Sequence, residues 1–172
     1  KETRPSIEDN TVNIEVIRVP HVSNFTDFTA LEQEPDVHLY YTRELPPEEY
    51  LPDALIIPGS KNTICDMQYL VDSGLDSRIR KLARRGIPVI GICGGFQMLG
   101  ERISDPNQAE SEHPHIPGLG LLPLSTVLRD RKQLRRVSGY DTVSGMRVDG
   151  YEIHVGETMP TGDCTPRFRL EN

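Results

Sequence analysis

Apolar and polar positions alternate along the first half of the chain in a pattern that predicts short strands separated by helices. Strands are expected over residues 14–19, 36–42, 53–57 and 88–92, each rich in β-branched or apolar residues. Apolar residues recur at helical spacing over 62–71 and 75–85, where Gly86 is a stop signal, and a further helix is expected to begin at Phe96. This alternation predicts an α/β fold in three layers, with a mostly parallel sheet covered by helices on both faces.

The rest of the chain gives weaker signals. Residues 1–11 are polar and aperiodic, which is typical of a linker or a cut end, so the domain is expected to span residues 12–172. The acidic segment 105–115 contains prolines and is expected to be a mobile surface loop. The basic and polar segment 130–145 carries little structural signal.

Composition narrows the classes of function. The formal net charge of −7 and the pI of about 5.2 argue against nucleic acid or an anionic membrane surface as the main partner. No apolar stretch approaches the roughly 18 residues that cross a bilayer, and no signal segment opens the chain. The three cysteines, Cys65, Cys93 and Cys164, form no CxxC pair, so neither a zinc site nor a disulfide framework is expected. These features are typical of a cytoplasmic protein with reduced thiols.

The strongest motif surrounds Cys93, where an expected buried strand runs straight into a helix and glycines occupy positions 91, 94 and 95. A cysteine at such a corner is the thiol form of a nucleophile elbow, because a sharp turn with small neighbours exposes the side chain at the edge of the sheet. The N-terminus of the following helix favours the thiolate, and free backbone N–H groups near Gly94 can bind an oxyanion. A buried structural cysteine is the plainer alternative.

A second loop, residues 58–63 (Pro-Gly-Ser-Lys-Asn-Thr), leaves the same expected sheet edge. It superficially resembles a phosphate loop, but it lacks the GxxxxGK[ST] spacing, so ATP is not expected to bind there. The backbone of Gly59 and Ser60 is instead expected to supply the second oxyanion donor. A helix cap formed by Asn62 or Ser60, with Asp66 in the first turn, is compatible with that role.

A third segment, residues 150–157, alternates so that Glu152 and His154 share one face of an expected strand. A histidine beside a carboxylate can act as a base held in one tautomer, and a histidine on a strand can equally be an ordinary packed residue; both interpretations stay open. No metal site is expected. For the remaining candidates, we expect His113 and His115 to be solvated, His21 and His38 to be structural or surface residues, and Cys65 to be part of the core.

Together these segments resemble the triad-type (class I) glutamine amidotransferases, whose fold is flavodoxin-like, and in particular their cobyric acid synthase branch. The resemblance covers nearly the whole chain from Ile14 onward. It rests on Arg-Val-Pro-His-Val-Ser-Asn-Phe-Thr-Asp-Phe at 18–28, Ile-Pro-Gly-Ser-Lys-Asn-Thr at 57–63, the Cys93 elbow, Pro-Gly-Leu-Gly-Leu-Leu-Pro at 117–123 and Gly-Tyr-Glu-Ile-His at 150–154. The elbow alone would indicate only some glutaminase or a related cysteine hydrolase, whereas its combination with Ser-Asn-Phe-Thr-Asp and Tyr-Glu-Ile-His is specific to the branch.

The resemblance implies that Cys93 attacks the side-chain amide of glutamine, forms a thioester and releases ammonia, after which water frees glutamate. By the same resemblance, the glutamine would be bound by Gln97 and Gly156, and the oxyanion hole would be formed by Gly59, Ser60 and Gly94. In this branch a synthetase domain lies N-terminal to the glutaminase, and it uses ATP and magnesium to activate corrinoid carboxylates that ammonia converts to amides. The implied function is the glutaminase half of an amidation in cobalamin biosynthesis. The implied partners are glutamine and the synthetase domain, with no cofactor in the glutaminase itself.

The chain departs from the branch in one respect. The resemblance implies a histidine in a Tyr-Leu-His-Gly type segment near the end of the domain, and no such segment occurs between Cys93 and Asn172. We therefore expect the domain to continue beyond this chain, the isolated chain to be a poor glutaminase, and one edge of the sheet to be unpaired. The resemblance places His154 in a wall of the glutamine pocket rather than as the base. Gly156 stands where a His-x-Glu pair would need a glutamate.

Three other interpretations are open. The nearest is the glutaminase subunit of a different amide ligase, such as one that amidates a diacid or a cell-wall precursor. A DJ-1-like cysteine hydrolase or redox sensor would not react with glutamine analogues. A non-catalytic binding domain, in which Cys93 is merely structural, would form no thioester.

Overall fold

A computed structural model of the chain describes residues 6–171, and the side chains of residues 130–133 and 155 lie outside that description, as do residues 1–5 of the expected linker. The first elements along the chain are β1 (Val12–Ile17), the 3-10 helix η1 (Phe25–Phe28), α1 (Thr29–Glu32), β2 (Val37–Thr42), β3 (Ala54–Ile57), α2 (Thr63–Asp72), α3 (Leu75–Arg84), β4 (Val89–Gly91) and α4 (Gly94–Leu99). The later elements are the strands β5 (Arg102–Ser104), β6 (His115–Pro117), β7 (Leu124–Asp141), β8 (Arg147–Pro160) and β9 (Phe168–Glu171).

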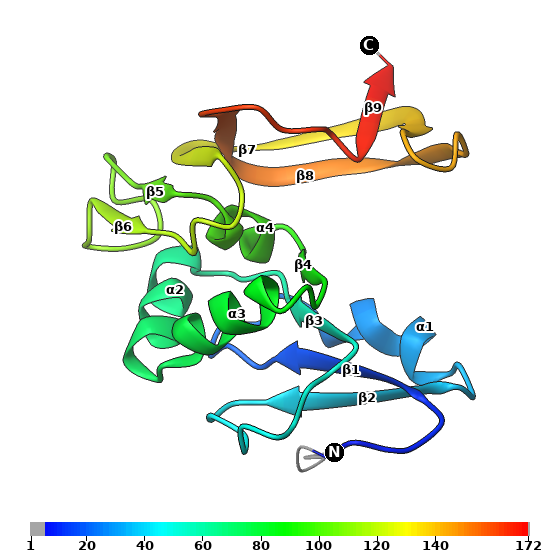
Figure 1. Cartoon of the computed structure of the whole chain (residues 1–172). Coiled ribbons are helices and arrows are strands. Elements are labelled where there is room, and N and C mark those ends of the chain that lie inside the picture. Colours follow the sequence, from blue (N-terminus) through cyan, green and yellow to red (C-terminus); the bar gives the residue numbers. More distant parts are fainter. Residues whose placement is uncertain (1–5, 172) are drawn as a thin grey trace.

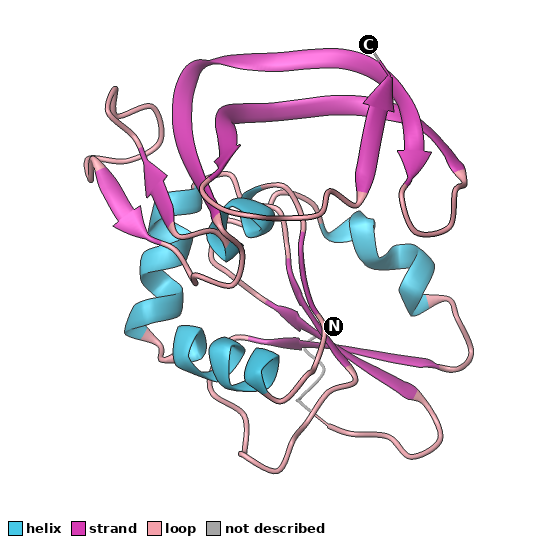
Figure 2. Ribbon diagram, turned by 45° about the horizontal axis from the view of Figure 1, so that its top comes forward, coloured by secondary structure: helices cyan, strands magenta, loops and turns pink. Residues whose placement is uncertain are grey.

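The first sheet is parallel and has the strand order β2-β1-β3-β4. Alternate residues of its strands point to opposite faces. Val16 and Ile56 pack with Phe28 on the side of η1 and α1. Their neighbours in the same strands, Ile17, Leu55 and Ile57, pack on the opposite side against α2 and α3. Figure 2 shows the strands between the two groups of helices. The expected three-layer α/β arrangement is therefore confirmed.

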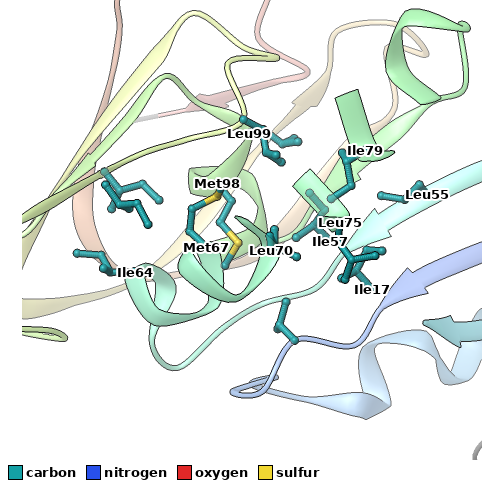
Figure 3. Packing of buried hydrophobic residues seen from close by; sticks show 14 of the residues in the cluster. Ile17, Leu55, Ile57, Ile64, Met67, Leu70, Leu75, Ile79, Met98 and Leu99 are labelled. Carbon is teal, nitrogen blue, oxygen red and sulfur yellow. The ribbon is translucent and has the colours of Figure 1, made fainter. Parts of the chain in front are cut away.

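The larger core lies between this sheet and the helices α2 and α3 (Figure 3). Apolar residues recur every three or four positions in both helices, so each helix presents one continuous apolar stripe to the strands. The fully buried side chains of this layer are Ile17, Leu55, Ile57, Ile64, Met67, Leu70, Leu75 and Ile79. Met98 of α4 joins the same cluster, which fixes the helix after the Cys93 corner onto the core.

A second sheet of mixed direction was not predicted from the sequence. It has the order β6-β5-β7-β8, and β9 pairs with β7. The segment 130–145, which carries little sequence signal, lies mostly in β7 and in the turn that joins it to β8. Leu124 and Leu128 at the start of β7 are buried, but apolar side chains farther along the hairpin remain in solvent, for example Leu134 at 67% exposure, so the pattern of the segment 130–145 does not mark a core-facing strand. The hairpin lies over the end of the α/β layers that carries α4 (Figure 1).

Three local expectations need correction. Helix α4 begins at Gly94, two residues before the expected Phe96, and its second residue, Gly95, packs so closely on β3 that a Cβ there would lie 2.2 Å from the Ile57 carbonyl oxygen. Cys65 is partly exposed on α2 and is not a core residue. The acidic loop is pinned rather than loose, since the buried carboxylate of Asp105 accepts N–H groups from Ala109, Glu110 and Ser111 at 2.7–3.0 Å.

The edge strands of the parallel sheet are β2 and β4. Within residues 6–171, β4 pairs with β3 alone, and Ile90 in its middle is 47% exposed. Because any open sheet has two such edges, whether β4 is an edge left by a missing segment stays a prediction. No helix in that part is both long and apolar enough to cross a membrane.

Candidate active site

Cys93 lies at a sharp corner between β4 and α4. Its backbone has φ 50° and ψ −110°, a left-handed conformation that costs energy for any residue with a side chain. The corner is closed by a hydrogen bond from the Gly95 amide to the Ile92 carbonyl at 2.8 Å. The side chain of Cys93 is exposed, as the sequence predicts for a nucleophile elbow and not for a buried structural cysteine.

Glycines make this corner possible. A Cβ at position 91 would lie 2.6 Å from the Gly95 carbonyl oxygen and from the Phe96 amide nitrogen. A Cβ at position 95 would overlap the carbonyl of Ile57 in β3. Any side chain at either position would push α4 away from the sheet, so the Gly-x-Cys-Gly-Gly spacing is a steric requirement of the corner.

The second loop packs directly against the corner. Asn62 caps α2 by accepting the Cys65 N–H at 3.1 Å, so the cap that the sequence predicts is present. A Cβ at Gly94 would lie 3.0 Å from the Ser60 amide nitrogen, and a Cβ at Gly59 would lie 3.7 Å from the Cβ of Cys93. The backbones of Gly59, Ser60 and Gly94 therefore meet beside the Cys93 side chain.

A cleft of about 660 Å³ opens beside Cys93, between α4 and strand β8. From α4 it is lined by Phe96 and the buried Gln97, and from β8 by residues that include Glu152, His154 and Gly156. The Thr63 hydroxyl donates a hydrogen bond of 3.4 Å to Gln97 Oε1 and so helps to fix the side-chain amide of Gln97. The structure thus brings candidate residues of two segments that are well separated in the sequence, 93–97 and 152–158, around one cleft, and the loop of Gly59 and Ser60 packs against the Cys93 corner beside it.

Glu152 and His154 share one face of β8, as the alternation predicts. His154 Nε2 lies 2.7 Å from Glu152 Oε1, and its Nδ1 lies 2.7 Å from the Gly156 carbonyl oxygen. Each ring nitrogen therefore lies beside an acceptor oxygen of its own strand, and a neutral ring, which carries one N–H, can donate to only one of the two. The hydrogen bonds from His154 and Arg135 lower the pKa of Glu152 below its ordinary value and keep it ionised at neutral pH.

Two polar contacts near the cleft were missed at the sequence level. Asp66 is fully buried and binds both His21 and Ser60, and His21, expected to be a structural or surface residue, is half exposed and makes this contact. Glu110, in the acidic loop, accepts the Thr63 N–H at 2.7 Å at the start of α2. The contacts of Asp66 with His21 and of Glu110 with Thr63 have no sequence signal, because each joins residues more than 40 positions apart.

A parallel sheet covered on both faces, with a strained cysteine corner at the carboxyl end of one strand, defines the class as an α/β protein of the glutamine amidotransferase fold. The fold is shared with the structure of PurLQS from Thermotoga maritima, with a TM-score of 0.69 and 17% identity over 94% of this chain and 76% of that one. A glutamine amidotransferase structure from the same organism gives a TM-score of 0.59 at 17% identity, covering 91% of this chain and 66% of that one.

The chain belongs to the CobB/CobQ-like glutamine amidotransferase domain family, which it matches over residues 13–172. It is 50% identical over 160 residues to cobyric acid synthase from Listeria innocua and 46% identical over 167 residues to cobyric acid synthase from Moorella thermoacetica. These alignments cover 93% and 92% of this chain but only 31% and 32% of the two relatives. The chain thus spans about a third of the length of these relatives.

Proposed function

We propose that this chain is a glutaminase domain in which Cys93 removes ammonia from the side chain of glutamine. The observation that carries the proposal is the exposed Cys93 side chain, held in a strained corner beside the Ser60 turn and opening into a cleft that Gln97 lines. Strained backbone of this kind concentrates at functional sites. Membership of the glutamine amidotransferase family supports glutamine as the substrate.

In the proposed reaction the thiolate of Cys93 attacks the amide carbon, and the carbonyl oxygen takes the negative charge. The amide groups of Ser60 and Gly94, with the backbone of Gly59, stabilise that oxyanion. Collapse of the intermediate breaks the C–N bond and leaves a thioester on sulfur, and the departing nitrogen takes up one proton from water and leaves as ammonia. Water then adds to the thioester, and breaking of the C–S bond releases glutamate and restores the thiol.

The cleft walls bind the amino acid end of the substrate in this proposal. Gln97 provides an amide beside the nucleophile, and Gly156 provides backbone at a point where its φ of 109° excludes larger residues. His154 holds the Gly156 carbonyl and the Glu152 carboxylate in place and so acts as part of the wall. The base is not assigned to His154, because each of its nitrogens lies beside an acceptor oxygen of its own strand.

For the whole protein we propose that the released ammonia amidates carboxylates of a corrinoid in cobalamin biosynthesis. Support comes from the curated relatives, which are cobyric acid synthases extending well beyond the aligned region. Residues 12–172 would form the glutaminase domain, and a synthetase domain preceding it would bind ATP and magnesium. The loop at residues 58–63 binds no nucleotide in this proposal, because its backbone is committed to the corner beside Cys93.

The test is alkylation of the chain with the diazo-ketone analogue of glutamine, followed by peptide mapping. We expect Cys93 to be labelled within minutes and Cys65 and Cys164 to stay unlabelled, since only Cys93 combines a reactive corner with a substrate cleft. Excess glutamine should protect Cys93 against the reagent, and Cys93→Ser should abolish labelling. Labelling at Cys65 or Cys164 in place of Cys93, or labelling that glutamine does not suppress, would contradict the proposed function.

A further inference from the structure

Asp66, in the first turn of α2, joins two loops that come from different strands. Its side chain is fully buried. Oδ1 accepts hydrogen bonds from the backbone N–H of His21 at 3.1 Å and from His21 Nδ1 at 2.8 Å. Oδ2 accepts the hydroxyl of Ser60 at 2.6 Å, and that hydroxyl accepts the Asn62 N–H at 2.9 Å. One carboxylate therefore fixes both the loop after β1 and the turn after β3.

The two loops are also joined by their backbones. The Ser23 N–H donates to the Gly59 carbonyl and the Lys61 N–H donates to the His21 carbonyl, each at 2.8 Å. These bonds flank Ser60, which lies opposite Val22 in an isolated antiparallel bridge. Neither of these two hydrogen bonds uses the Ser60 N–H. This N–H lies on the side of the turn that packs against Gly94.

We infer that Asp66 and His21 are positioning residues that hold the Ser60 amide beside the Cys93 corner. This inference rests on the proposed function, because the Ser60 amide matters there only if an oxyanion forms next to it. Oxyanion donors act by being fixed before the reaction, and a displacement of about 1 Å can cost about 100-fold in rate. The contacts of Asp66 reach the backbone of residues 59–61 from two sides, which is what such fixing requires.

A purely structural role makes different predictions. Helix α2 is capped by Asn62, so Asp66 is not needed as its cap. The side chain of His21 is 47% exposed, so its truncation leaves no buried cavity. Loss of the His21 ring should therefore change stability little. If the ring positions the turn, its loss should still slow the reaction of Cys93 with glutamine-like reagents.

The variants exploit the shape of the histidine ring. The side-chain nitrogen of asparagine occupies the place of Nδ1, so His21→Asn retains the donor to Asp66. His21→Ala removes that donor, and His21→Gln moves it to the place of Nε2. Asp66→Asn replaces one acceptor oxygen by a donor. The matched control is Asp76→Asn, since Asp76 is also a buried acid in the first turn of a helix, α3, and pairs with Arg80 away from the cleft.

Two reagents separate positioning from general damage. The diazo-ketone analogue of glutamine needs the oxyanion site, whereas iodoacetamide reports only the exposure and ionisation of the Cys93 thiol. We expect His21→Ala, His21→Gln and Asp66→Asn to slow diazo-ketone labelling of Cys93 by about 10- to 100-fold. Labelling by iodoacetamide should stay within about threefold of the parent. His21→Asn should recover most of the loss, and Asp76→Asn should behave as the parent with both reagents.

The inference is overturned if Cys93 is labelled by the diazo-ketone as fast in the His21 and Asp66 variants as in the parent. It is also overturned if the variants slow labelling by both reagents equally, or if His21→Asn slows diazo-ketone labelling as much as His21→Ala does. His21 variants keep the test decisive should Asp66→Asn unfold, and a thermal melt of each variant identifies unfolding. If the parent itself is not labelled by the diazo-ketone at Cys93, the proposed function fails and the inference fails with it. If the diazo-ketone labels the parent but the variants do not slow this reagent more than iodoacetamide, the inference fails and the proposed function stands.

Discussion

Gly94 faces Ser60 so closely that a Cβ at position 94 would lie 3.0 Å from both the amide nitrogen and the Cβ of Ser60. The same Cβ would lie 3.1 Å from the Thr63 hydroxyl. A side chain at Gly94 would thus displace the turn that carries one proposed oxyanion donor, instead of projecting into the space of the tetrahedral intermediate. The two halves of the proposed oxyanion hole are in this way sterically interdependent.

From that contact we expect Gly94→Val to lower the glutaminase rate by about 100- to 1000-fold, the usual effect of losing one oxyanion donor. Initial rates of glutamate release by the full-length protein at saturating glutamine measure this effect. Gly150→Val is the matched control, because nothing lies within 4 Å of a Cβ at position 150. A Gly94→Val rate within a few-fold of the parent would remove this turn from the oxyanion site.

Arg78 forms the buried ion pair of the fold. Its Nη1 lies 2.7 Å from Glu15 Oε1, and the two side chains are 10% and 0% exposed. Because removal of one partner leaves an uncompensated buried charge, we expect Arg78→Met to lower the free energy of unfolding by about 3–5 kcal/mol. Urea denaturation measures this value.

A matched change on the same helix is Lys81→Met, which breaks the exposed pair between Lys81 and Glu48. It should cost no more than about 1 kcal/mol. Combining Arg78→Met with Glu15→Gln should recover part of the loss, because the remaining partner is then neutral. Equal costs for Arg78→Met and Lys81→Met would show that Glu15 is not a buried charge.

Glu110 should make stability depend on pH. Burial raises the pKa of Glu110 above its ordinary value, with smaller contributions from Asp105 and Asp66, although the Thr63 N–H favours the ionised form. A raised pKa in the folded state means that the associated stability is fully present below the unfolded pKa of 4.5 and is lost as pH rises through the folded pKa.

Glu110→Gln keeps the acceptor for Thr63 without the charge. We therefore expect the variant to be more stable than the parent at pH 7, and the difference to disappear as pH falls below about 4.5. Thermal melts from pH 4 to pH 8 measure both curves. A parent that is more stable than Glu110→Gln at pH 7 would reverse the sign and show that the hydrogen bond outweighs burial.

The strands β1 to β4 and the helices α2 and α3 were predictable because their apolar residues recur with periods set by local geometry. The Cys93 corner was predictable for the same kind of reason, since glycines at 91 and 95 are demanded by contacts within the corner and with β3. The β7–β8 hairpin was not, because its apolar residues beyond Leu128, such as Leu134 and Ile153, lie in solvent and mark no core face. The contact between His21 and Asp66 spans 45 positions and arises only when two loops meet at the sheet edge.

His154 is the one histidine among the described residues that line the cleft, and its behaviour tests which role it has. Its two nitrogens face the Glu152 carboxylate and the Gly156 carbonyl, each at 2.7 Å, which ties the ring to the wall of the cleft. We expect His154→Ala to raise the glutamine concentration needed for half-protection of Cys93 by about tenfold, as loss of a pocket contact worth about 1.4 kcal/mol would. The rate of labelling by iodoacetamide at neutral pH should stay within about threefold, because the thiolate does not depend on this ring. Glu152→Gln, which keeps an acceptor for the ring but removes its charge, should show a smaller change in protection. If His154→Ala instead slows iodoacetamide by 100-fold or more, about the lower end of what a positioned base contributes, His154 activates the thiol and the wall assignment is wrong.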